Sequence, residues 1–228
     1  FDHMSKPVFF WIALIYLCFY DSSAFQKFEK IKRKTDLFYV KFTVNLVGKR
    51  KDEFIMEVRY EWAPIGAARI KELVKAKYFD GCRFFRVIKD FMVQFGLNGN
   101  PNITAEWKDK KMFDDTVIQV NTRSYVSFAA SGPNTRTTQL FINTVDNINL
   151  DNMGFSPVGK IVEGMEIVDE LYAGYGDAGE GDGKDGKGPS QPRIIEEGNK
   201  YLKRYFPKLD YIVKAEIVQW KDSSSLDL

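Results

Sequence analysis

Two alternating patterns of apolar and polar residues open the folded part of the chain. Every second side chain is apolar from Phe38 to Leu46, and the same alternation recurs over residues 54–60. A period of two is typical of strands that bury one face. The charged stretch 48–52 between the two runs predicts a turn, so the runs form a β-hairpin.

Helical spacing appears next, followed by a series of short β-rich runs. Pro64 suits the first turn of a helix, and apolar residues recur at helical spacing up to about Lys77. A second helix is expected over about 164–171 and a short helix within 192–207. Strands are predicted at 82–87, 92–95, 117–120, 125–129, 140–143, 157–161 and 211–220. We therefore expect a mainly β fold, a closed antiparallel eight-stranded β-barrel capped by two helices.

Residues 84–94 set the cation of Arg86 and the amide of Gln94 among apolar side chains, a composition that suits a proline-binding site. In extended strands, Phe84 and Arg86 share one face, and Met92 and Gln94 share a face in the same way. A guanidinium beside apolar side chains is costly to bury without a partner. Arg86 is therefore either a structural residue paired with an acid or a functional cation.

A second segment, residues 127–142, runs from a short strand through a Gly-Pro-Asn turn into another strand. Together the two segments resemble the cyclophilins, the peptidyl-prolyl cis-trans isomerases. The resemblance continues through residues 150–151 and 158–168, and so covers most of residues 37–219. It implies the same capped β-barrel and the rotation of X–Pro peptide bonds, in support of protein folding.

The resemblance also implies the roles of individual residues. Arg86 and Gln94 are the expected catalytic residues: Arg86 donates to the prolyl nitrogen and Gln94 holds a substrate carbonyl. Ala129 offers backbone contacts, and Gln139 lines the groove. The apolar pocket for the proline ring is expected from Phe91, Met92, Phe141 and Leu150. For the aromatic residues the alternative is an ordinary place in the core.

The reactive side chains of the domain suit a reaction that needs no proton transfer. No histidine follows His3, and Cys82 is the only cysteine after Cys18. Ser-His-Asp and Cys-His arrangements and the usual zinc sites are therefore excluded from the domain. The barrier to amide rotation, about 18–20 kcal/mol, comes from resonance, and a donor aimed at the twisted nitrogen lowers it. We expect no metal or cofactor.

Two positions depart from the cyclophilin pattern. Many cyclophilins have Trp just before the Leu-Asp pair, where this chain has Asn149. They also carry a pocket histidine a few residues later, where this chain has residues 153–156 with one extra residue; Phe155 is the candidate replacement. We therefore expect cyclosporin to bind weakly and the substrate preference to change, with turnover retained.

Charge and local composition restrict the partners. Lysine and arginine number 33 against 31 acids, so the net charge creates no strong electrostatic attraction for nucleic acid. We expect proline-containing polypeptides as partners and a monomeric chain. The Gly-rich, acidic stretch near 174–192 predicts an exposed insert. Within it, residues 181–187 nearly match a phosphate-binding loop, but Gly188 stands where a magnesium-binding Ser or Thr is needed, so nucleotide binding is not expected.

The first residues have the features of an export signal. An extension of three residues precedes Met4; Lys6, an apolar run over 8–20 and a small-residue site ending at Ala24 follow. We expect a signal peptide over 1–24, a basic linker over 25–36, the domain over 37–221 and a tail over 222–228. The location is then the secretory pathway, in the endoplasmic reticulum or outside the cell, without stable membrane insertion after cleavage.

Other interpretations of location and function stay open. The basic residues of 27–34 leave a retained signal anchor or a solvated linker as alternatives. Phe25 after Ala24 also resembles the junction of two-part plastid presequences. For function, a non-catalytic module or chaperone would hold proline-containing segments in the same groove. A structural barrel with an inactive site is disfavoured, because all the motif residues remain.

Overall fold

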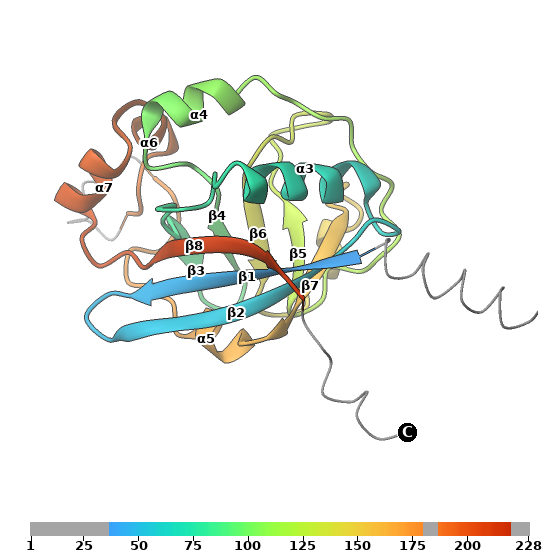
Figure 1. Ribbon diagram of the computed structural model, residues 1–228, viewed down its shortest axis with the longest axis horizontal. Helices are drawn as coiled ribbons and strands as arrows, with labels where there is room; N and C mark the ends of the chain where they lie inside the picture. The colour runs from blue at the N-terminus through green and yellow to red at the C-terminus, as the bar shows by residue number, and fades with distance from the viewer. Residues whose placement is uncertain (1–36, 180–186, 220–228) are drawn as a thin grey trace, which may run out of the picture. The chain divides into compact units, whose positions relative to one another are not determined.

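The computed structural model describes residues 37–179 and 187–219, and the predicted signal peptide, basic linker and C-terminal tail lie outside them (Figure 1). The described residues are mainly β and form an antiparallel eight-stranded sheet in the order β3-β4-β6-β5-β7-β2-β1-β8. The strands are β1 (Leu37–Leu46), β2 (Arg50–Arg59), β3 (Arg86–Ile88), β4 (Met92–Phe95), β5 (Tyr125–Phe128), β6 (Leu140–Asn143), β7 (Pro157–Glu163) and β8 (Tyr211–Val218).

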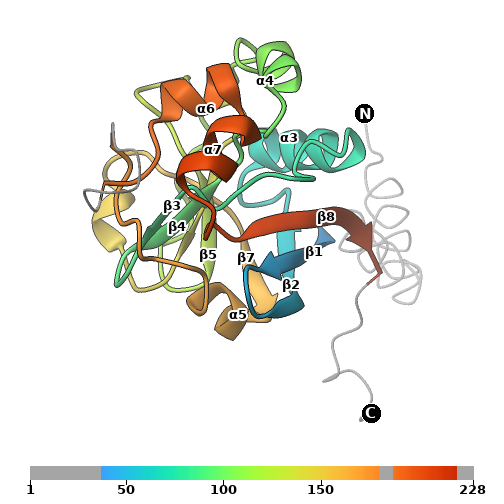
Figure 2. The same cartoon turned by 90° about the vertical axis from the view of Figure 1, so that its left-hand side faces the viewer.

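Short helices surround the sheet, and α3 and α5 lie at opposite ends of it (Figures 1 and 2). Both were predicted from the sequence, whereas their predicted role as caps of a closed barrel is not confirmed. The helical elements are α3 (Pro64–Lys75), α4 (Pro101–Trp107), η1 (Ile148–Leu150, a 3₁₀ turn), α5 (Met165–Asp169), α6 (Gln191–Glu197) and α7 (Asn199–Tyr205). None of the helices in the described ranges is long and apolar enough to cross a bilayer.

Two helical predictions need correction. The single helix expected within 192–207 is two helices, because Gly198, with φ at +58°, ends α6 and starts α7. Helix α4 was not predicted. It begins where the side chain of Asn100 accepts a hydrogen bond from the N–H of Asn102 at 3.0 Å, with Pro101 in the first turn.

The predicted hairpin is present, and its alternation builds the core. β1 pairs with β2 from Leu37 opposite Arg59 to Leu46 opposite Arg50. The side chains at every second position of β1 from Val40 onward are fully buried. β2 then approaches β7 so closely that a Cβ on Gly159 would collide with the backbone of β2, which explains a glycine inside that strand.

The predicted closure into a barrel is not confirmed, because no strand ladder joins β3 to β8 at the two edges of the described sheet. β3 is only three residues long, and the chain before it lies against the start of β8. There the N–H of Gly81 donates to the carbonyl of Ile212 at 2.8 Å, and the N–H of Phe84 donates to that of Asp210 at 3.1 Å. The described sheet is therefore curled, with isolated contacts between its edges.

Two strand predictions were wrong. Residues 117–120 form no strand: Ile118 and Val120 are 55% and 48% exposed, so their alternation faces solvent. The chain there is held along a loop, since the N–H of Asn121 donates to Oδ1 of Asp151 at 2.9 Å. The strand predicted at 82–87 begins only at residue 86 and ends at residue 88.

Candidate active site

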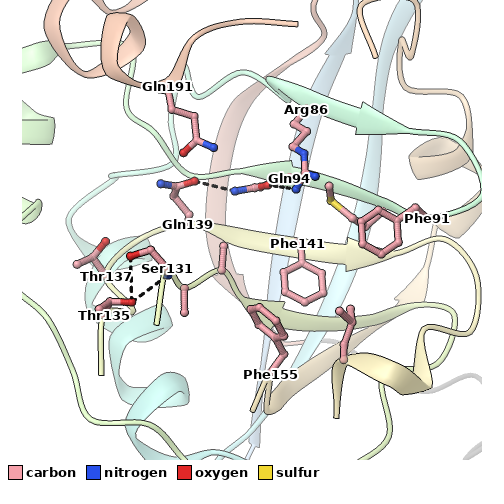
Figure 3. Close-up of a pocket in the computed structure, with 14 residues that line it drawn as sticks. Arg86, Phe91, Gln94, Ser131, Thr135, Thr137, Gln139, Phe141, Phe155 and Gln191 are labelled. Atoms are coloured by element: carbon pink, nitrogen blue, oxygen red, sulfur yellow. Dashed lines mark hydrogen bonds between the residues drawn. The ribbon is translucent and has the colours of Figure 1, made fainter. Parts of the chain in front are cut away.

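A cavity of about 310 Å³ lies on the face of β3, β4 and β6 that is turned away from the main core (Figure 3). All the predicted site residues line it: Arg86, Phe91, Met92, Gln94, Ala129, Gln139, Phe141 and Leu150. Phe155, the candidate replacement for a pocket histidine, also lines it. The sequence analysis did not assign the remaining lining residues, which are Ala130, Ser131, Thr135, Thr137 and Gln191. The structure therefore brings the two predicted motifs together in one site.

Strand alternation explains which side chains enter the cavity. In β4, Met92 and Gln94 line the cavity, as predicted, while the residues between and after them join the main core. In β3, Arg86 faces Gln94 across the pairing register. The prediction that Phe84 shares a face with Arg86 was wrong. Phe84 is fully buried in the main core, because it precedes the strand and does not follow its alternation.

A chain of hydrogen bonds runs along one wall of the cavity. Nη1 of Arg86 donates to Oε1 of Gln94 at 3.0 Å, and Nε2 of Gln94 donates to Oε1 of Gln139 at 2.8 Å (Figure 3). Each amide thus fixes the orientation of the group before it. In a complex, Gln94 would donate its second amide hydrogen to the expected substrate carbonyl.

Arg86 also has an acidic partner, as one of the sequence interpretations required. Its Nε donates to Oδ1 of Asp177 at 2.5 Å. The side chains are 26% and 63% exposed, so this is not a buried structural pair. The hydrogen bond with Arg86 lowers the pKa of Asp177 below its ordinary value of 3.8, and the carboxylate is ionised at neutral pH.

The opposite wall of the cavity is apolar. Met92, Phe141 and Leu150 form a buried cluster, and Phe91 and Phe155 pack against it. The ring of Phe155 meets that of Phe141 edge to face, with centroids 5.5 Å apart and planes at 82°. This is the residue that the sequence analysis offered in place of a pocket histidine. Asn149, by contrast, is exposed on η1 and does not line the cavity.

A buried network of asparagines supports this apolar wall. Nδ2 of Asn121 donates to Oδ1 of Asp151 and to the carbonyl of Phe155, both at 2.7 Å. Nδ2 of Asn147 donates to the carbonyl of Phe91 at 2.9 Å and to Oδ1 of Asn143 at 2.8 Å. Sequence reasoning missed the network, because isolated asparagines near turns look like loop residues. Their burial depends on contacts between distant segments.

Ala129 and Gln191 enter the site through the backbone and through a helix. The N–H of Ala129 donates to the carbonyl of Gln139 at 2.9 Å, so the expected backbone contact to a substrate would use its carbonyl oxygen. Gln191 is the first residue of α6, and its side chain points toward the cavity (Figure 3). Like Asp177, it belongs to the predicted Gly-rich insert near 174–192, where the sequence analysis assigned no site residue.

The described residues offer little nucleophilic or metal chemistry. Within residues 37–179 and 187–219 no group of three or more His, Cys, Asp or Glu side chains could hold a metal ion. Cys82 is fully buried, and burial raises the pKa of its thiol far above the ordinary value. What the cavity does offer is a fixed cation beside an apolar pocket, which suits recognition of a ring and polarisation of a nearby nitrogen.

Comparison with known proteins assigns the family. Residues 39–197 match the model described as "Cyclophilin type peptidyl-prolyl cis-trans isomerase/CLD", and every residue that lines the cavity falls in this range. The human protein "Peptidyl-prolyl cis-trans isomerase-like 3" is 36% identical over 122 residues, which are 51% of this chain and 73% of the human one. "Peptidyl-prolyl cis-trans isomerase" from Acinetobacter baylyi is 33% identical over 117 residues, 48% of this chain and 61% of the bacterial one.

A solved structure supports the fold. The crystal structure of a cyclophilin type peptidyl-prolyl cis-trans isomerase from Cryptosporidium parvum has a TM-score of 0.57 with this chain and covers 81% of it and 99% of itself. Its sequence is 18% identical, so this likeness bears on the fold alone. The family model spans well over half of the chain and includes the whole cavity. The chain therefore belongs to the cyclophilin-type peptidyl-prolyl cis-trans isomerase family.

Proposed function

We propose that the chain rotates X–Pro peptide bonds in the cavity that Arg86 shares with Met92, Phe141 and Leu150. The observation that carries the proposal is the juxtaposition itself: a hydrogen-bonded guanidinium stands beside an apolar pocket in one cavity of about 310 Å³. The proline ring would occupy the pocket and place its nitrogen near the cation. Family membership makes an isomerase, rather than a non-catalytic proline-binding module, the favoured function.

Arg86 would act because the prolyl nitrogen changes during rotation. In the planar amide its lone pair is delocalised into the carbonyl, and the nitrogen is a poor acceptor. In the twisted state the lone pair returns to the nitrogen, which becomes a good acceptor for an N–H of Arg86. A rate gain of roughly 10⁶ needs about 8 kcal/mol of differential stabilisation. A preorganised cation in a site that the substrate covers can supply much of it.

The other lining residues would hold the substrate chain on either side of the proline. Gln94 would donate its second amide hydrogen to a substrate carbonyl, and Gln139 would keep Gln94 oriented. The carbonyl of Ala129 would accept from a substrate N–H. Phe91 and Phe155 would enclose the ring edges. These contacts are to the backbone and the ring, so they favour proline-containing polypeptides of varied sequence as partners.

Finer features of fold and partners belong to the same proposal. The sheet would close into a barrel through residues 81–84 and the start of β8, which the isolated bridge between Arg83 and Tyr211 supports. Slow exchange of the Gly81 and Ile212 amide hydrogens would be the signature. We further propose a monomer that assists folding and binds cyclosporin weakly, because Asn149 is exposed and lies off the cavity wall.

The location proposal rests on the sequence of residues 1–24 alone. Lys6, the apolar run after it and the small residues up to Ala24 support export into the secretory pathway and removal of the signal. N-terminal sequencing of the protein from its native cell tests this. A chain that starts just after Ala24 agrees with the proposal, and a chain that starts at Met4 or Ser5 contradicts it.

The activity is tested by exchange NMR on a proline-containing peptide mixed with a small molar fraction of the protein. Cis and trans resonances of the peptide interconvert over tens of seconds to minutes without a catalyst. We expect exchange cross-peaks at millisecond-to-second mixing times that grow with protein concentration. A peptide that binds, as shown by shift changes, without faster interconversion would instead support a binding module.

A further inference from the structure

A carboxylate from the Gly-rich segment reaches the guanidinium of Arg86. Oδ1 of Asp177 accepts from Nε of Arg86, and the two residues are 91 positions apart in the sequence. Nη1 of Arg86 donates to Gln94 on its other side. Among the residues that the structure describes, none hydrogen bonds to Nη2. A guanidinium carries five N–H donors in one plane. Because Asp177 and Gln94 fix this plane through Nε and Nη1, the remaining N–H groups have defined directions.

We propose that Asp177 is a positioning residue for Arg86: together with Gln94 it holds the guanidinium at two edges, so that the free N–H groups face the bound prolyl nitrogen. This inference rests on the proposed function, because it assigns Asp177 a part in the same reaction. Asp177 does not line the cavity and would touch no substrate. Its effect would pass entirely through Arg86.

The backbone around Asp177 is built to hold the carboxylate in place. The carbonyl of Asp177 accepts from the N–H of Gly188 at 2.7 Å, and the N–H of Ala178 donates to Oδ1 at 2.7 Å. Gly188 is buried, and a Cβ there would approach the carbonyl oxygen of Asp177 to 2.5 Å. Two residues before Asp177, the ring of Tyr175 packs against that of Phe206 with centroids 5.0 Å apart. The segment is therefore anchored on both sides of Asp177.

The ion pair between Arg86 and Asp177 contributes little to the stability of the fold. The Asp177 side chain is 63% exposed, and ion pairs in such surroundings contribute little to folding. The pair matters more for the orientation of the guanidinium, since a long arginine side chain loses much rotamer freedom when it is fixed. A guanidinium that is already oriented before the substrate binds need not lose that freedom during the reaction. The pair would therefore affect turnover more than the free energy of unfolding.

The test compares Asp177→Ala, Asp177→Asn and Gly188→Ala with a control, Asp169→Ala. Asp169 forms an ion pair of similar exposure with Arg123 and does not line the cavity. Exchange NMR at saturating peptide gives turnover, titration gives the peptide affinity, and the Nε–Hε resonance of Arg86 reports the hydrogen bond directly. We expect Asp177→Ala to lower turnover by about two- to fivefold with unchanged affinity.

The other variants sharpen the result. Asp177→Asn keeps an acceptor oxygen and should fall between wild type and alanine, while Gly188→Ala should reproduce the loss with Asp177 in place. The Hε resonance should shift in all three and not in Asp169→Ala. Wild-type or higher turnover in Asp177→Ala, or a loss of affinity alone, would overturn the inference. A wild-type protein that does not isomerise the peptide would overturn the proposed function instead.

Discussion

Oε1 of Gln94 accepts a hydrogen bond from Nη1 of Arg86 at 3.0 Å, across the register pair that joins β3 to β4. The two side chains come from neighbouring strands only a few residues long, so their relative position is set by the sheet itself. A short hairpin can thus hold a cation and an amide at hydrogen-bonding distance inside one cavity. This relationship is the basis of the first prediction.

Gln94→Ala should lower isomerase turnover by about tenfold, because a hydrogen bond to a charged group is lost and the guanidinium gains freedom. Gln139→Ala is the matched control. It removes only the amide–amide bond at 2.8 Å and should cost about two- to threefold. Turnover is measured by exchange NMR at saturating peptide. The same loss in both variants would show that Arg86 does not depend on Gln94 in particular.

Asn121→Ala should destabilise the fold by about 2–4 kcal/mol, because it removes the side-chain donor to the carboxylate of Asp151 and to the carbonyl of Phe155 and leaves Asp151 only the backbone N–H of residue 121. Peptide affinity should fall as well, since Phe155 and Leu150 lose their support. Urea unfolding and peptide titration provide the measurements. Asn149→Ala, an exposed position on η1, is the control and should change stability by less than about 0.5 kcal/mol. Equal stabilities of the two variants would contradict the supporting role of the network.

Periodicity predicted the regular parts of this fold well. The β1–β2 hairpin, β4 and β6 appear at the predicted positions, because alternation and turn chemistry are local signals. The prediction of a strand at 117–120 was wrong because the structure there depends on a non-local contact. Its alternating apolar residues face solvent, and the hydrogen bond from Asn121 to Asp151 that fixes the loop joins residues 30 positions apart. No local pattern could have revealed it.

The residues of the site also fall into those that the sequence predicted and those that it did not. The lining residues from the two motifs were predictable, because a family resemblance fixes residue types in order along the chain. Asp177 was not, since an acid in a Gly-rich segment reads as part of a solvated loop. Its place depends on the bond between its carbonyl and the N–H of Gly188. The asparagine network was missed because its asparagines are buried although polar, and because it joins segments that are far apart in the sequence.

Asp210 should make folding stability depend on pH. The residue is 4% exposed, and its carboxylate accepts from the N–H groups of Val47 and Tyr172 at 2.6 and 2.7 Å. Burial raises its pKa above the ordinary value of 3.8. The ionised form is therefore the costly one in the folded state, and its penalty grows as pH rises from about 3.8 through the folded-state pKa.

Asp210→Asn removes this titration. The free energy of unfolding of wild type, relative to Asp210→Asn, should fall with rising pH by about 1.4 kcal/mol per unit within that window and level off above it. Urea unfolding of both proteins from pH 3.5 to 7 provides the data. A difference that rises with pH would mean that the two backbone donors outweigh burial, and that the pKa is lowered.

Asn149→Trp should raise the affinity for cyclosporin by roughly ten- to a hundredfold. An indole at this position adds an N–H donor and a large apolar surface next to Leu150, together worth about 1–3 kcal/mol. Asn149 is exposed and supplies neither. Calorimetric titration of both proteins gives the ratio. Asn149→Leu separates the two contributions, since it adds apolar surface without a donor, and equal affinities of wild type and Asn149→Trp would refute the prediction.

Arg86→Ala provides the most direct test of the catalytic assignment. The Arg86 interaction strengthens mainly when the prolyl nitrogen is twisted, so its removal should lower turnover far more than ground-state affinity. Arg86→Lys should recover little, because an ammonium does not reproduce a planar fork held by Gln94 and Asp177. The variants should keep the wild-type thermal midpoint to within a few degrees, since the side chain is partly exposed.

The measurement is the isomerisation rate of a bound proline peptide by exchange NMR, with peptide affinity and thermal midpoint taken on the same samples. We predict that Arg86→Ala loses about a hundredfold or more in rate, as expected when a preorganised transition-state donor is removed, while affinity and midpoint stay near wild type. An alanine variant that isomerises at the wild-type rate, or one that unfolds, would contradict it.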